Sequence, residues 1–177
     1  MAITFHPDGS ITGAKIHQTG MVLQVQQTYK TDTFNDSLTY NDETGDITGL
    51  TASITPSDAS NKILIMFDVM TGNSASSRIG IKLYKAGSVL TGSLGDADGS
   101  NSRVTAYCST MTYDRSWGIS GKYLDTAGGT SAITYSLRLR IGNSASNTVY
   151  VNRQATLYNS AGSMLAGSSL ILMEIAA

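Results

Sequence analysis

Apolar and polar side chains alternate along most of this sequence with a period of two residues, which is typical of β-strands that bury one face. The alternation runs through the stretches 22–29, 47–56, 78–84, 104–113, 117–124, 135–141, 149–151 and 156–158. Turn-forming glycine, asparagine, serine and aspartate separate the stretches at intervals of about ten residues. No segment keeps a helical period over three turns. The pattern therefore predicts an all-β protein of about nine or ten strands.

Two further stretches are apolar on both faces. They read KILIMFDVMT at 62–71 and LILMEI at 170–175. One face of an antiparallel sheet usually contacts water, so a strand that is apolar on both faces lies deep inside the protein or is covered by another subunit. We expect neighbouring central strands or an oligomer interface here. The expected interface residues are Leu64, Met66, Phe67, Leu172 and Met173.

Many short strands joined by glycine- and serine-rich turns predict two antiparallel sheets packed as a jelly-roll-like β-sandwich. Residues 1–20 differ, because a Pro7-Asp8-Gly9 turn signal leaves only short strand pieces there. We expect an N-terminal arm over 1–20 and the sandwich domain over 21–177. The segment 31–42 reads as an irregular, polar connection.

The pentapeptide GNSAS occurs twice, at 72–76 and at 142–146. Glycine and asparagine tolerate positive φ angles, and serine caps turns through its hydroxyl group. We expect both copies to form turns or sheet-crossing connections, with a functional site as the alternative.

The composition of the chain restricts the classes of partner that are expected. The 177 residues are 41% hydrophobic and 14% charged, with a net charge of -1, so one domain is expected without a field that attracts nucleic acid or an anionic membrane. No apolar run is long enough for a membrane helix, and the N-terminus lacks the basic start and apolar run of a signal peptide. Synthesis and folding in a cytoplasm are expected.

Few residues suggest catalysis or metal binding. Asp96 and Asp98 resemble the start of a calcium loop, but Tyr107 stands where such a loop needs a glutamate, so a turn is preferred over a weak calcium site. The one cysteine, Cys108, is expected in the core. Asp68, within an apolar strand, is expected to pair with an arginine or a backbone group. We expect no enzyme, no metal and no cofactor.

Aromatic and polar residues gather in the stretch TYDRSWG. A ring beside hydrogen-bonding side chains can stack on a sugar, so these residues form a candidate glycan contact. They are Tyr113, Asp114, Arg115 and Trp117. Packing in the core or at an interface is the alternative for Trp117.

Four segments resemble β-sandwich modules in virion structural proteins of tailed bacteriophages, particularly marine ones. They are VLQVQQTYKTDTF (22–34), ITGLTASITPSDASNKILIMFDV (47–69), RIGIKLYKAGS (78–88) and GDADGSNSR (95–103). The resemblance implies a protein of the virion, of the capsid-decoration or fibre type, and carries over no catalytic residue.

These observations give a hypothesis of function. The protein is expected to decorate a phage particle, as a capsid decoration (cement) protein or short fibre, and to form a homotrimer bound to capsid or tail proteins. The arm would dock onto the particle through Ile3, Phe5, Ile11 and Ile16. The alternative is a fibre tip or lectin-like module that binds host-surface glycans.

Overall fold

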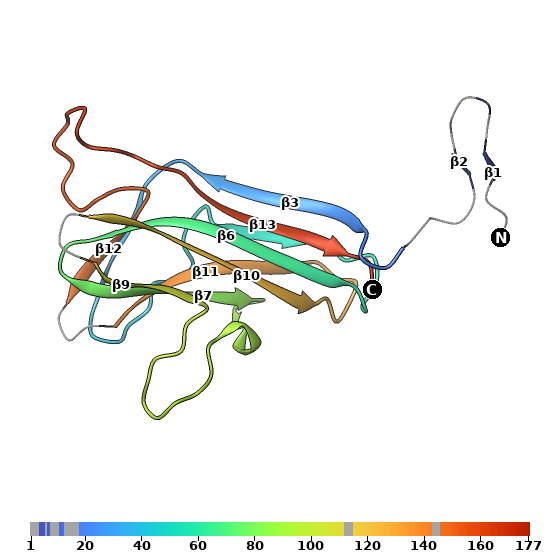
Figure 1. Ribbon diagram of the computed structural model, residues 1–177, viewed down its shortest axis with the longest axis horizontal. Helices are drawn as coiled ribbons and strands as arrows, with labels where there is room; N and C mark the ends of the chain where they lie inside the picture. Colours follow the sequence, from blue (N-terminus) through green and yellow to red (C-terminus); the bar gives the residue numbers. More distant parts are fainter. Residues whose placement is uncertain (1–3, 6, 8–10, 13–17, 112–114, 143–145) are drawn as a thin grey trace.

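The computed structural model describes residues 4–5, 7, 11–12, 18–111, 115–142 and 146–177. In these residues a six-stranded antiparallel sheet packs on a five-stranded one (Figure 1). The predicted all-β, two-sheet sandwich is confirmed, with eleven sandwich strands instead of nine or ten. No described helix is long and apolar enough to cross a membrane.

The six-stranded sheet is organised around its longest strand, β6. It comprises β3 (Val22–Lys30), β4 (Phe34–Leu38), β6 (Lys62–Asn73), β10 (Ser116–Thr126), β12 (Asn147–Val151) and β13 (Ser168–Ile175). β10 pairs along one side of β6, and β13 followed by β12 pairs along the other. β3 then pairs with β13, and β4 pairs with β12.

The five-stranded sheet is organised around β7. It comprises β5 (Thr51–Ile54), β7 (Ser77–Lys85), β8 (Ser88–Val89), β9 (Ala106–Met111) and β11 (Ile133–Ile141). β11 pairs with β7 and β5, while β8 and β9 pair with the other side of β7. A single 3-10 turn, Thr91–Ser93, follows β8. In the N-terminal region β1 (Thr4–Phe5) pairs with β2 (Ile11–Thr12).

The chain crosses repeatedly between the two sheets, as in a jelly roll, and both GNSAS copies lie at such crossings. Gly72 and Asn73 end β6, residues 74–76 join β6 to β7, and the second copy lies between β11 and β12 along the chain. The Ser74 amide donates to the Thr148 carbonyl at 2.9 Å, and the Ser74 hydroxyl donates to Asn147 Oδ1 at 2.9 Å. The first copy is thus bonded to the start of the strand that follows the second, which supports the turn interpretation.

The core lies between the inward faces of the two sheets. Fully buried aliphatic side chains from both sheets include Ile63, Ile65, Ile79, Ile81, Leu83, Leu137, Leu139, Ile141 and Leu170. Burying one such side chain contributes about 1.5–3 kcal/mol. The single cysteine, Cys108, packs half-buried against this core, as its alternating run predicts.

Two expectations about strands were wrong. Residues 34–38, read as irregular, form β4, which pairs with β12 and is joined to it by a 3.1 Å hydrogen bond between the hydroxyls of Ser37 and Thr148. Polar side chains that face solvent hid this strand. Residues 156–158, read as a strand, lie in the β12–β13 connection, where Leu157 and Tyr158 are exposed. The division into an arm and a domain stays a prediction.

Candidate functional site

The outward face of the six-stranded sheet is unusually apolar. Its exposed apolar side chains are Val22, Val25, Tyr29 and Leu124. Between them lie the half-buried side chains of Leu64, Met66, Met70, Ile171, Met173 and Ile175. We call these ten residues the outer apolar face. Antiparallel sheets that meet water on one face normally carry polar residues there.

Strand register brings part of the outer apolar face into a continuous row. Val25 of β3 lies opposite Met173 of β13, Met173 opposite Leu64 of β6, and Leu64 opposite Leu124 of β10. Neighbouring strands are about 4.8 Å apart, so the row extends for about 15 Å across four strands. The next row contains Ile171 opposite Met66. The apolar side chains of these two rows are therefore contiguous.

Three charged residues stand on the same face, of which Lys62 is half-buried and bonded to Thr126 and the other two are exposed. Asp68 of β6 lies opposite Ser120 of β10, and Lys122 of β10 lies opposite Met66. Both side chains are exposed. Asp68 projects from this face, and its expected pairing with an arginine or a backbone group at a subunit contact stays a prediction.

The structure divides the interface residues proposed from the sequence. Leu64, Met66 and Met173 belong to the outer apolar face, where a partner can reach them. Phe67 and Leu172 are only 1% and 0% exposed, because they project into the core of the same chain. Alternate residues of a strand point to opposite faces. The proposed interface is therefore narrowed to the first three residues and their neighbours.

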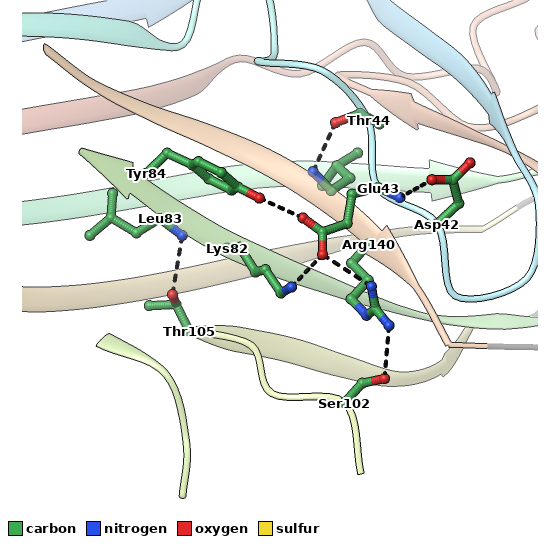
Figure 2. Close-up of polar contacts among 10 residues, drawn as sticks. Asp42, Glu43, Thr44, Lys82, Leu83, Tyr84, Ser102, Thr105 and Arg140 are labelled. Carbon is green, nitrogen blue, oxygen red and sulfur yellow. Dashed lines mark hydrogen bonds and ion pairs between the residues drawn. The ribbon is translucent and has the colours of Figure 1, made fainter. Parts of the chain in front are cut away.

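The opposite sheet carries a polar cluster centred on Glu43 (Figure 2). The Glu43 carboxylate pairs with Lys82, accepts a hydrogen bond from Arg140 at 3.0 Å and accepts another from the Tyr84 hydroxyl at 2.7 Å. Arg140 also donates to Ser102 Oγ at 3.1 Å. One carboxylate thus joins β7 and β11 to the segment that precedes β5.

The segment before β5 is held along β11 by backbone bonds. The Thr44 amide donates to the Leu139 carbonyl, and the Thr44 hydroxyl accepts from the Leu139 amide. Burial tends to raise the pKa of Glu43, but Lys82, Tyr84 and Arg140 outweigh it and lower that pKa. Glu43 is therefore a structural anion that orients two cations.

A second buried carboxylate, Glu174 of β13, stabilises one end of the sandwich. It accepts hydrogen bonds from Gln24 Nε2 at 2.6 Å, Asn61 Nδ2 at 2.6 Å and the Ser57 amide at 2.7 Å. These donors fix the connection between β5 and β6 against β13. The chain has two glutamates, and each lies at the centre of such a network. Their scarcity is the sequence signal that could have identified both.

The candidate glycan contact is described in part. Tyr113 and Asp114 lie outside the described residues. Arg115 and Trp117 are exposed, with 49% of Trp117 accessible at the start of β10. The proposed contact therefore stays a prediction.

The candidate calcium loop is exposed. Asn101 donates to Asp98 through its side chain at 3.2 Å, as in a local turn, and Asp96 lies in an irregular segment. Among the described residues, no three His, Cys, Asp or Glu side chains gather to hold a metal ion.

Two of the four proposed anchoring residues have a described backbone. Phe5 and Ile11 are cross-strand partners in the β1–β2 pair. Ile3 and Ile16 lie outside the described residues. Docking of this region onto a particle remains a proposal.

Comparisons with known proteins give distant structural matches. No protein-family model and no curated protein matches the sequence. The structure of infectious bursal disease virus, Gx strain, is 13% identical, with a TM-score of 0.46, and the match covers 100% of this chain and 42% of that chain. T=1 particles derived from the same virus give 14% identity, a TM-score of 0.46, and coverage of 100% and 41%.

A third match is an insecticidal delta-endotoxin of Bacillus thuringiensis. It is 11% identical, with a TM-score of 0.36, and the match covers 98% of this chain and 29% of that chain. This chain spans less than half the length of each of these solved chains.

Proposed function

We propose that this protein is a non-enzymatic structural protein of a bacteriophage virion, which decorates the particle surface and assembles with copies of itself. The observation that carries the proposal is the outer apolar face, with its row from Val25 through Met173 and Leu64 to Leu124. Contiguous apolar patches on a protein surface mark sites that another molecule covers. Capsid decoration, or cement, and a short fibre are the two forms proposed.

The proposed occupant of the outer apolar face is another copy of the same chain. A closed ring of identical chains needs two complementary patches on each copy. Asp68 and Lys122 are exposed and carry opposite charges, so the acid of one copy can meet the base of the next. A homotrimer is the proposed state.

The setting in a virion is supported by sequence. The segments 22–34, 47–69, 78–88 and 95–103 resemble modules of tailed-phage virion proteins. Capsid or tail proteins are the proposed partners, with the N-terminal arm, including Phe5 and Ile11, as the part that contacts them.

The non-enzymatic part of the proposal is supported by the environment of Cys108, the one cysteine of the chain. The thiol donates to the Ile79 carbonyl at 3.7 Å. Burial raises the pKa of Cys108, which opposes formation of the reactive thiolate.

Light scattering of the purified protein tests the assembly. The expected mass is three times the chain mass of 18.7 kDa. A Met66→Glu/Met173→Glu variant places two carboxylates on the outer apolar face and should dissociate the assembly without touching the core. Thr134→Glu, at an exposed position on the opposite sheet, is the matched control and should keep the wild-type mass.

The outcomes separate folding from assembly. Circular dichroism should give the same β-rich spectrum for all three proteins. A wild-type monomer at micromolar concentration would contradict self-assembly. A double variant that keeps the wild-type mass would show that the contact lies elsewhere.

A second candidate function is recognition of host-surface glycans by a fibre tip. Arg115 and Trp117 are separated by one residue and both are exposed, which favours this function. A glycan array with the wild type and Trp117→Ala tests this site, and a glycan signal that is lost in the variant supports recognition there.

A further inference from the structure

The tripeptide Arg-Ile-Gly occurs at 78–80 in β7 and again at 140–142, and the structure pairs the two copies. Ile79 lies opposite Ile141, and Arg140 lies opposite Gly80. The Gly142 amide donates to the Arg78 carbonyl at 3.0 Å. Both isoleucines are fully buried, so both arginines project from the outward face of the five-stranded sheet.

The paired tripeptides lie beneath a hollow of about 540 Å³ on this face. Its lining includes two guanidinium groups, two phenol rings and small polar side chains. Six of these residues are Arg78, Arg140, Tyr40, Tyr107, Ser100 and Asn101. Both tyrosines are exposed, with 66% of Tyr107 accessible.

Strand register explains the arrangement of the hollow. Gly80 pairs with Arg140 of β11 on one side and with Tyr107 of β9 on the other. A guanidinium and an aromatic ring therefore stand on either side of a residue that has no side chain. Val104 packs over the glycine, where a Cβ atom would overlap its side chain, and so forms an apolar part of the lining between the cation and the ring.

The two arginines are held in different ways. Arg140 is fixed by Glu43 and Ser102, while its buried Nε has no hydrogen-bond partner in the described part of the chain (Figure 2). Arg78 is exposed, and no described carboxylate pairs with it. Lys82 and Arg140 share the one carboxylate of Glu43. Arg78 is therefore the cation of the lining that lacks a described carboxylate. Asp42 and Asp98 carry negative charge beside the lining residues Asn41 and Asn101.

We propose that this hollow binds an acidic saccharide. A carboxylate placed between Arg78 and Arg140 would accept charged hydrogen bonds, for which the planar guanidinium is well suited. The sugar ring would pack on Tyr107 or Tyr40, and its hydroxyls would contact Ser100 and Asn101. A small inorganic anion would leave both rings unused.

The proposed saccharide site does not depend on the proposed assembly. It lies on the five-stranded sheet, whereas the outer apolar face belongs to the six-stranded sheet. Copies joined through the outer apolar face would leave the hollow open. A failure of either proposal is therefore distinguishable from a failure of the other.

Ligand-observed NMR titration with matched sugars tests the site. The probes are trigalacturonic acid, its neutral counterpart galactotriose, N-acetylneuraminic acid and inorganic sulfate. We expect the wild type to bind at least one acidic sugar and to bind galactotriose at least tenfold more weakly. Arg78→Gln should weaken acidic-sugar binding about tenfold or more, the loss expected for a charged hydrogen bond.

Two further variants show which groups carry the binding. Arg153→Gln removes an arginine that does not line the hollow and should bind like the wild type. Tyr107→Ala should weaken the acidic sugar but leave any sulfate binding unchanged.

Four outcomes would overturn the proposal. They are failure of every acidic sugar to bind at millimolar concentration, equal binding of galactotriose, undiminished binding by Arg78→Gln, and sulfate binding as tight as that of the acidic sugars. The last would reduce the site to one for oxyanions alone.

Discussion

Asn61 Nδ2 donates a 2.6 Å hydrogen bond to the carboxylate of Glu174, which is 1% exposed. The same asparagine accepts from the Ala177 amide through its side-chain oxygen at 3.1 Å. One side chain thus joins the β5–β6 connection both to β13 and to the residues that follow it. Buried carboxylates with several donors are stabilised in the charged form.

The first prediction concerns the stability of the fold at low pH. Burial alone would raise the pKa of Glu174, but hydrogen bonds from Gln24, Asn61 and Ser57 outweigh it and lower the pKa to about 2 from an ordinary 4.5. The folded pKa is below the unfolded one, so the stabilisation is present above about pH 4.5 and is lost as the pH falls toward 2. Glu174 should contribute about 3 kcal/mol to the loss of stability that urea unfolding measures over this range.

Glu174→Gln isolates the contribution of this carboxylate. The variant should be less stable than the wild type at pH 7, because buried donors lose a charged acceptor. Its free energy of unfolding should fall less between pH 4.5 and pH 2. An acid dependence equal to that of the wild type would contradict the assignment to Glu174.

The second prediction concerns glycine in β10. Gly121 lies opposite Phe67, and a Cβ atom there would overlap the buried Phe67 ring. Gly121→Ala should therefore lower the free energy of unfolding by about 1–3 kcal/mol. Gly118→Ala, in the same strand but with open space around its Cβ position, should change it by less than about 0.5 kcal/mol. Equal effects of the two substitutions in urea unfolding would contradict the packing described.

The third prediction concerns the polar cluster on the five-stranded sheet. Glu43→Gln leaves Lys82 and Arg140 without their shared carboxylate, so we expect a loss of about 2 kcal/mol in the free energy of unfolding. Asp46→Asn breaks the more exposed pair with Arg138 and should cost less than about 1 kcal/mol. Thermal and urea unfolding measure both. A larger loss of unfolding free energy for Asp46→Asn than for Glu43→Gln would contradict this prediction.

The fold class follows from the sequence because alternation reports burial directly. In β7 and β11 the residues on one face are fully buried and the arginines and lysine on the other are not. The same reasoning from alternation failed for two segments, β4 and residues 156–158. β4 is held partly by the Ser37–Thr148 contact, and residues 156–158 lie in the connection between β12 and β13.

The candidate sites were less predictable, because they depend on which strands become neighbours. Strands that are apolar on both faces indicated the outer apolar face. Because both faces are apolar, the sequence pattern could not say whether Phe67 or Met66 faces the core. The pairing of Arg140 with Gly80 follows from the register of β7 and β11, which are far apart in sequence. No local pattern around either residue contains that information.

The fourth prediction tests whether the outer apolar face meets itself. Asp68→Lys and Lys122→Asp should each weaken self-assembly about tenfold, because like charges would then face each other across the contact. The doubly substituted protein should assemble like the wild type. An attraction between positions 68 and 122 of one chain could also explain that recovery. The two single variants are therefore mixed. Asp68→Lys copies carry lysine at both positions and should co-assemble with Lys122→Asp copies, which carry aspartate at both. Sedimentation equilibrium measures the association constants, and a mixture no tighter than its components would show that these charges do not meet between copies.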